Sequence, residues 1–145
     1  MITSEFYYEI QPVSKPRQTI SDKWKQRPCV LRYRAYADEM RAAGAFQDFY
    51  LGERCAMIFE LEMPKSWSKK KRALMCGKPH TQKPDWDNLC KAVADLFLVD
   101  DSGIHTVFAA KFWGEKGSVR IFNIGQDANY QLSDLLRLIR SSSMI

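Results

Sequence analysis

The sequence predicts a single α+β domain in which a small mixed sheet has helices packed on one side. Segments rich in strand-forming residues alternate with segments of helical periodicity, two strand-like segments come close together late in the chain, and no internal repeat is visible. The chain has 145 residues, which is near the usual size of one domain. We therefore expect residues 1–145 to fold as one unit.

The first half of the chain is predicted to supply two strands and one helix. Residues 6–10 combine aromatic and β-branched side chains ahead of a proline, which favours a strand. Residues 30–45 are rich in alanine and arginine, and Gly44 near the end is a plausible stop, which predicts a helix. Residues 55–63 alternate weakly between apolar and charged side chains and stop at Pro64, so they predict a second strand. The basic segment that follows is predicted to be a loop.

The second half of the chain is predicted to contain one strongly periodic helix and a hairpin. After Pro84, four apolar residues recur at helical spacing and would face the core: Leu89, Val93, Leu96 and Phe97. Residues 104–113 and 118–124 predict two strands joined by a glycine-containing turn, which is the pattern of a β-hairpin. Residues 132–139 predict a short amphipathic helix near the end of the chain.

The basic residues are concentrated in two parts of the chain, whose formal net charge is +5. From Lys65 to Lys83 there are seven basic residues and no acidic one, and a looser basic group runs through residues 15–34. Such blocks suit a polyanion, because each lysine or arginine that neutralises a phosphate releases condensed counterions. The alternative is a solvated loop that binds nothing. For a DNA partner, the expected contacts are Lys65, Trp67, Lys69, Lys70, Lys71, Arg72, Lys78 and Lys83.

The composition excludes several classes of protein. With 46% hydrophobic and 27% charged residues, it is that of an ordinary globular protein and not of a disordered one. No apolar run approaches the ~20 residues of a membrane helix, and the first residues do not resemble a signal peptide, so a cytoplasmic protein is expected. The four cysteines lack Cys-x-x-Cys spacing, which favours buried, reduced thiols. Zinc binding at Cys76 and His80 is not favoured, because no second pair of ligands is nearby.

Acidic residues flank the predicted second helix at both ends. Asp85 and Asp87 stand in an extended lead-in, where we expect Asp87 to cap the helix, and Lys91 follows one turn later. A second pair, Asp100 and Asp101, comes just after the helix, where the chain could turn back toward the first pair. Three or four carboxylates suit Mg²⁺, a hard cation that takes oxygen ligands. The alternative is an ordinary helix start with a capping aspartate.

Two motifs make the chain similar to a known family. The first reads Lys-Pro-Asp-x-Asp-Asn-Leu-x-Lys-Ala-Val-x-Asp over residues 83–95, with Asp-Asp-Ser at 100–102. The second is the basic segment 63–72, followed by Gly-Lys-Pro-His-Thr at 77–81. These motifs resemble the RusA-like endodeoxyribonucleases, which resolve Holliday junctions and are common in phages and prophages. The span between the lysine of the first motif and the second aspartate pair is a few residues shorter than is usual in that family.

The resemblance implies a role for each acidic residue and a set of partners. Asp85, Asp87 and Asp101 would be catalytic carboxylates that bind the metal, with Asp100 as the alternative to Asp101, and Lys91 would be the catalytic lysine. Members of the family act as homodimers on four-way junctions and introduce paired nicks. Their cofactor is Mg²⁺, for which Mn²⁺ can substitute.

A mechanism follows from this set of residues. The metal would polarise a phosphate oxygen and lower the pKa of the water that attacks phosphorus, and Lys91 would stabilise the developing charge. Trp67 or Trp86 could stack on an exposed base, whereas Trp24 and Trp113 are expected in the core. Two alternatives stay open: the same chemistry on flaps or replication forks, and a DNA-binding accessory protein without catalysis.

Overall fold

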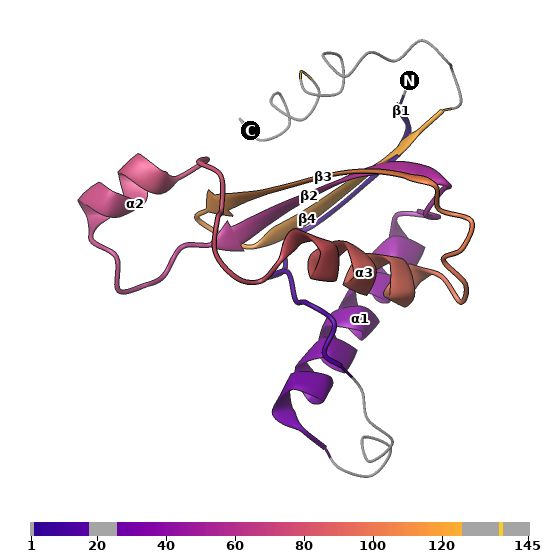
Figure 1. Ribbon diagram of the computed structural model, residues 1–145, viewed down its shortest axis with the longest axis horizontal. Helices are drawn as coiled ribbons and strands as arrows, with labels where there is room; N and C mark the ends of the chain where they lie inside the picture. The colour runs from indigo at the N-terminus through magenta and orange to yellow at the C-terminus, as the bar shows by residue number, and fades with distance from the viewer. Residues whose placement is uncertain (1, 18–25, 126–136, 138–145) are drawn as a thin grey trace.

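The computed structural model describes residues 2–17, 26–125 and 137. Its elements form one domain with a four-stranded mixed sheet and three helices, which confirms the predicted α+β class (Figure 1). The predicted helix over residues 132–139 lies, apart from Arg137, outside the described residues. In chain order the elements are β1 (Ile2–Tyr8), α1 (Pro28–Phe46), β2 (Arg54–Glu62), α2 (Lys69–Met75), α3 (Trp86–Phe97), β3 (Thr106–Gly114) and β4 (Ser118–Ile124).

The strands lie in the order β1-β4-β2-β3 across the sheet. β2 runs parallel to β3 and antiparallel to β4, so the last two strands flank β2 and do not pair with each other. The predicted hairpin is therefore wrong, although both of its strands exist. β2 is an interior strand whose backbone groups pair with β3 on one edge and β4 on the other, and most of its side chains are buried.

The connection from β3 to β4 passes the end of β2. Met63, which follows β2, donates its N–H to the carbonyl oxygen of Gly114 at 3.0 Å. A Cβ on Gly117 would lie only 2.4 Å from the Cα of Gln11, so only glycine fits this approach of two backbones. Gly117, which the sequence placed in the turn of a hairpin, thus allows two backbone segments to pack closely at the end of the sheet.

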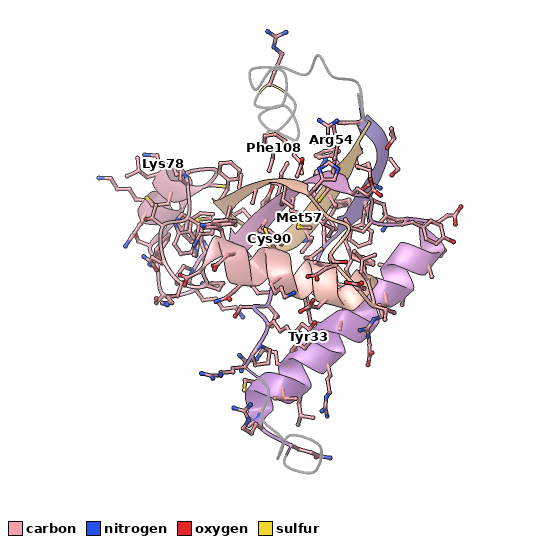
Figure 2. The ribbon with its side chains drawn as sticks, turned by 45° about the vertical axis from the view of Figure 1, so that its right-hand side comes forward. Tyr33, Arg54, Met57, Lys78, Cys90 and Phe108 are labelled. Atoms are coloured by element: carbon pink, nitrogen blue, oxygen red, sulfur yellow. The ribbon has the colours of Figure 1, made fainter. Side chains whose placement is uncertain are left out.

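The main core lies between the sheet and the two longer helices. α1 and α3 pack on the same face of the sheet, as predicted (Figure 1). Figure 2 shows Met57 of β2 and Cys90 of α3 in the layer between the sheet and α3. The opposite face of the sheet carries a smaller buried cluster. Its members are Ala56, Ile58, Phe122 and Ile124.

α3 is fixed to the domain by one apolar face. Its buried residues are Leu89, Ala92, Val93, Ala94 and Leu96, in agreement with the predicted helical spacing. Burying a leucine or valine side chain is worth roughly 1.5–3 kcal/mol. The exposed face of the same helix carries the charged residues, which are therefore displayed on a rigid support.

α2 replaces part of the segment that was predicted to be a loop. Ser68 caps this helix by accepting the N–H of Lys71 at 3.2 Å, and the lysine, arginine, alanine, leucine and methionine that follow all favour helix. No residue of α2 is buried. The helix was missed because, without a buried face, it has no apolar periodicity.

The four cysteines are free thiols, which confirms that they form no disulfide. Cys55 is buried and Cys90 is half-buried, but Cys29 and Cys76 are exposed, so the expectation of buried thiols is wrong for these two. None of the helices in the described ranges combines the length and the apolar character that crossing a membrane requires.

Candidate active site

The start of α3 presents two exposed carboxylates. Asp85 occupies the N-cap position with an extended backbone (φ −70°, ψ 147°), and its carbonyl oxygen accepts the N–H of Leu89 at 3.2 Å. Asp87 lies in the first helical turn, so the expectation that Asp87 caps the helix is wrong. The Asp85 side chain makes no capping hydrogen bond and instead lies 3.3 Å from the ammonium of Lys83. The carboxylate of Asp85 therefore makes no hydrogen bond to the helix backbone and can bind another group.

Lys111 of β3 fastens the segment that leads into α3. Its Nζ donates to the carbonyl oxygens of Gln82 and Pro84 at 2.5 and 2.7 Å. This lysine ties the backbone directly before Asp85 to the sheet. Sequence reasoning missed Lys111, since a single lysine in a strand has no local pattern that distinguishes it from an exposed one.

Lys91 and Asp101 join the two acidic regions of the sequence. The Lys91 ammonium lies 2.5 Å from the Oδ2 atom of Asp101 and 3.2 Å from the Oδ1 atom of Asp95. Hydrogen bonds to Asp101 and Asp95 raise the pKa of Lys91, and the bond from Lys91 lowers the pKa of Asp101. The chain after α3 turns back onto the helix and brings Asp101 to Lys91, whereas the sequence predicted an approach to Asp85 and Asp87.

Asp100 has a different local role from Asp101. Its Oδ1 atom accepts the backbone N–H of Ser102 at 3.0 Å, and this bond lowers the pKa of Asp100. Asp100 therefore closes the turn after α3, whereas Asp101 faces Lys91. The sequence alone could not separate these neighbours.

The donor set suits a hard cation, but the carboxylates are not gathered around one point. Asp85, Asp87 and Asp101 offer the oxygen ligands that Mg²⁺ prefers. Within residues 2–17, 26–125 and 137, no three acidic, histidine or cysteine side chains lie close enough together to hold an ion. In this arrangement the Lys91 ammonium contacts the Oδ2 atom of Asp101 and offsets its charge.

The predicted DNA-binding residues lie on α2 and the segments that flank it. Lys69, Lys70 and Lys78 are exposed, whereas Arg72 contacts the carbonyl of Pro64 and the carboxylate of Glu115 at 3.3 and 3.4 Å. Figure 2 shows Lys78 at the same end of the molecule as α2. The exposed lysines form a basic surface, while Arg72 also holds the segment to the β3–β4 connection.

The tryptophans differ in their surroundings. Trp113 is buried, as predicted, and its ring centroid lies 4.8 Å from that of Trp67, while the Lys71 ammonium lies 4.3 Å above the Trp67 ring. Trp86, at the start of α3, is 58% exposed. Of the two tryptophans considered for base stacking, Trp86 has the more accessible ring. Trp24 lies outside the described residues.

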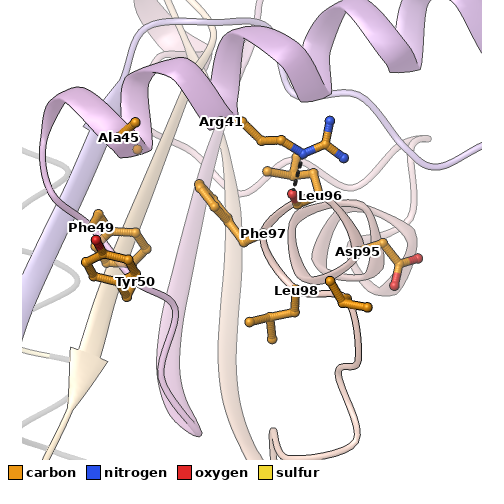
Figure 3. A pocket seen from close by; sticks show the side chains of 10 residues that line it. Arg41, Ala45, Phe49, Tyr50, Asp95, Leu96, Phe97 and Leu98 are labelled. Carbon is orange, nitrogen blue, oxygen red and sulfur yellow. Dashed lines mark hydrogen bonds between the residues drawn. The ribbon is translucent and has the colours of Figure 1, made fainter.

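The acidic residues lie on an open surface. A pocket of about 560 Å³ is present between the end of α1 and the end of α3, and its walls include Phe49, Phe97 and Leu98 (Figure 3). Figure 3 shows the Asp95 carboxylate directed away from these apolar side chains. Asp85, Asp87 and Asp101 do not line this pocket. An exposed site of this kind is accessible to a polymer such as duplex DNA.

One comparison with known proteins identifies a family. A family model described as "Endodeoxyribonuclease RusA" matches residues 9–122, which is well over half of the chain. The matched segment includes both aspartate pairs and the basic segment, and it confirms the resemblance that the motifs predicted. No curated protein matches the chain.

Proposed function

The chain belongs to the RusA endodeoxyribonuclease family, and from this premise we propose that it is a magnesium-dependent enzyme that resolves four-way DNA junctions by paired nicks. Family membership makes it an endonuclease of the kind that acts on Holliday junctions and implies a divalent metal. The choice of Mg²⁺, with Mn²⁺ as a substitute, and the residue roles are our proposal.

The 2.5 Å contact between Lys91 and Asp101 carries the assignment of residues. It links the second aspartate pair to Lys91, on the helix that begins with Asp85 and Asp87, which supports grouping both acidic regions in one site. We assign Asp85, Asp87 and Asp101 as metal ligands. We do not assign Asp100 as a metal ligand, because its side chain already accepts the backbone N–H of Ser102.

The cation and the side chains of the protein have different roles in the proposed cleavage. A bound divalent cation supplies positive charge at the phosphate and lowers the pKa of the attacking water. Lys91 has an exposed ammonium that can donate to a nonbridging phosphate oxygen, which stabilises the charge that develops there. Before the cation binds, Lys91 offsets the charge of Asp101.

The basic surface would hold the DNA backbone near this centre. Its phosphate contacts would position the junction and carry no sequence information. The proposed DNA contacts are Lys65, Trp67, Lys69, Lys70, Lys71, Arg72, Lys78 and Lys83. A C2 homodimer would present two equal sites to the two strands of a four-way junction, which accounts for paired nicks. The enzyme would act on cytoplasmic DNA during recombination.

A cleavage assay tests the proposal. The protein is incubated with labelled four-way junction, flap and linear duplex, each with Mg²⁺, with Mn²⁺ or with a chelator. We expect paired nicks in the junction only when metal is present, and light scattering should give a dimer mass. Preferred cutting of flaps would overturn the junction as substrate, and cutting in the chelator would overturn the metal requirement.

A matched pair of variants tests the site. Asp101→Asn should abolish cleavage, whereas Asp100→Asn should retain most of it, because asparagine can still accept the Ser102 N–H. The reverse order would assign the metal to Asp100. Normal cleavage by both variants would remove this pair from the site.

A further inference from the structure

Four charged side chains form a continuous chain on and beside α3. The Lys15 ammonium lies 2.5 Å from the Oδ2 atom of Asp95, whose Oδ1 atom lies 3.2 Å from Lys91, which in turn contacts Asp101. Each Asp95 oxygen thus serves a different lysine. The residues come from two distant parts of the sequence, since Lys15 and Asp95 are 80 positions apart.

Asp95 is the least exposed member of this chain. Its side chain is 18% exposed, against 54% for Lys91 and 34% for Asp101. Asp95 also lies one helical turn after Lys91, on a helix whose apolar face is buried. A shielded carboxylate on a fixed backbone holds its partner more firmly than an exposed one does, because solvent screens it less.

Lys15 is held against Asp95 by the segment that carries it. Ile10 and Val13 pack against the main core, so the chain between β1 and α1 is anchored ahead of Lys15. The Lys15 ammonium occupies the oxygen of Asp95 that Lys91 does not use. This contact orients the carboxylate and offsets its charge.

The proposed metal role of Asp101 has a consequence for Lys91. If a bound cation draws the Asp101 carboxylate away from Lys91, Lys91 loses the nearer of its two carboxylate partners. A lysine ammonium has three donors and a flexible stem, so without a second partner it would sample many positions. Asp95 is that second partner, and its contact with Lys91 does not depend on Asp101.

We propose that Asp95 is a positioning residue that keeps the Lys91 ammonium at the reaction centre while Asp101 binds metal, and that Lys15 holds Asp95 in the orientation this requires. The inference rests on the proposed catalytic role of Lys91. Because both of its oxygens are engaged by lysines, Asp95 is not assigned as a metal ligand. The motif aspartate that ends the 83–95 segment thereby acquires a role distinct from the other carboxylates.

A double-mutant cycle tests this role in the full-length protein. Asp95→Asn should lower the turnover number for junction cleavage by about tenfold to a hundredfold, the usual effect of removing a group that orients a functional residue. The junction dissociation constant should stay within about twofold of the parent value. Lys15→Met should lower turnover less, and the exposed Asp38→Asn on α1 is the matched control that should change nothing.

The cycle is completed with Lys91→Met. If Asp95 acts through Lys91, adding Asp95→Asn to Lys91→Met should produce no further loss of residual turnover. Losses that multiply would overturn the inference, because Asp95 would then act independently of Lys91. A Lys91→Met variant that cuts normally would instead overturn the proposed catalytic role of Lys91.

A second measurement does not depend on cleavage. Ammonium groups held by carboxylates give sharp ¹H–¹⁵N signals, whereas free ones exchange too fast to be seen. In Asp101→Asn the Lys91 signal, assigned by its absence in Lys91→Met, should persist, and in Asp101→Asn/Asp95→Asn it should disappear. A Lys91 signal that survives without Asp95 would overturn the inference even if Lys91 proves to be catalytic.

Discussion

α2 and α3 are both charged helices, but only α3 has a buried face. α3 turns Leu89, Val93 and Leu96 into the core, whereas α2 buries no residue. The proposed chemistry lies on the fixed helix and the proposed backbone contacts on the exposed one. A reacting centre needs side chains at defined positions, while phosphate binding tolerates flexible lysines. The difference predicts that changes to the exposed face of α3 alter turnover, that changes to its buried face alter stability, and that changes to α2 alter only affinity for DNA.

Asp87→Asn should have the largest effect, because asparagine keeps the size of the side chain and removes the charge that a metal requires. Junction cleavage should fall by about a hundredfold to a thousandfold, as for other losses of one electrostatic group at a reacting centre. The melting temperature and the affinity for the junction should stay unchanged. Normal cleavage would reduce Asp87 to a residue of the first helical turn.

Matched leucine substitutions compare the support of the two helices. Leu89→Ala removes a fully buried side chain of α3 and should lower the free energy of unfolding by about 2–5 kcal/mol. Leu74→Ala on α2 removes a side chain that is 63% exposed and should change it by less than about 0.5 kcal/mol. Urea unfolding measures both values. Equal losses would mean that α2 is not held as weakly as its exposure indicates.

Removing two lysines of α2 should weaken DNA binding without changing the chemistry. If Lys69 and Lys70 each contact one phosphate of duplex DNA, Lys69→Ala/Lys70→Ala should reduce the slope of log affinity against log salt by about 1.8. Turnover at saturating junction should stay at the parent value. A fall in turnover with an unchanged salt slope would move these lysines from DNA binding to the reaction centre.

The smallest expected effect is a difference in alkylation rate among the four cysteine thiols, which does not involve cleavage activity. Burial raises the pKa of Cys55 to about 11 and that of Cys90 to about 12, so at about pH 8 both are almost wholly in the unreactive thiol form. Cys29 and Cys76 are exposed. An alkylating reagent at about pH 8 should therefore label Cys29 and Cys76 first, as read by peptide mass mapping. Similar labelling rates for all four would show that α3 opens more readily than its packing suggests.

The parts of the fold that could be predicted from the sequence are those with a local cause. The spacing of Leu89, Val93 and Leu96 predicts α3 because burial of one face imposes helical periodicity. The strand pairing could not be predicted, since two neighbouring strands separated by glycines favour a hairpin unless a third strand lies between them. β2 is that strand, and its place between β3 and β4 depends on the whole sheet.

The candidate site also combines residues that local spacing predicts with residues that only the tertiary structure brings together. Asp85, Asp87 and Lys91 belong to one helix start, so local spacing was enough to group them. The distinction between Asp100 and Asp101 depends on a turn, and the ion pair of Lys15 with Asp95 joins residues that no periodic pattern relates. Lys111 is similar, because its partners are the backbone carbonyls of a distant segment.

The position of β4 between β1 and β2 also affects how the protein can fold. β1 has no neighbour in the sheet other than β4, so the strand synthesised first pairs with the strand synthesised last among those described. Closing such long loops lowers the folding rate, since chain entropy is lost before the contacts form. During synthesis β1 can therefore pair only after residues 118–124 have emerged, and until then its unpaired backbone groups are available to other chains, which favours aggregation.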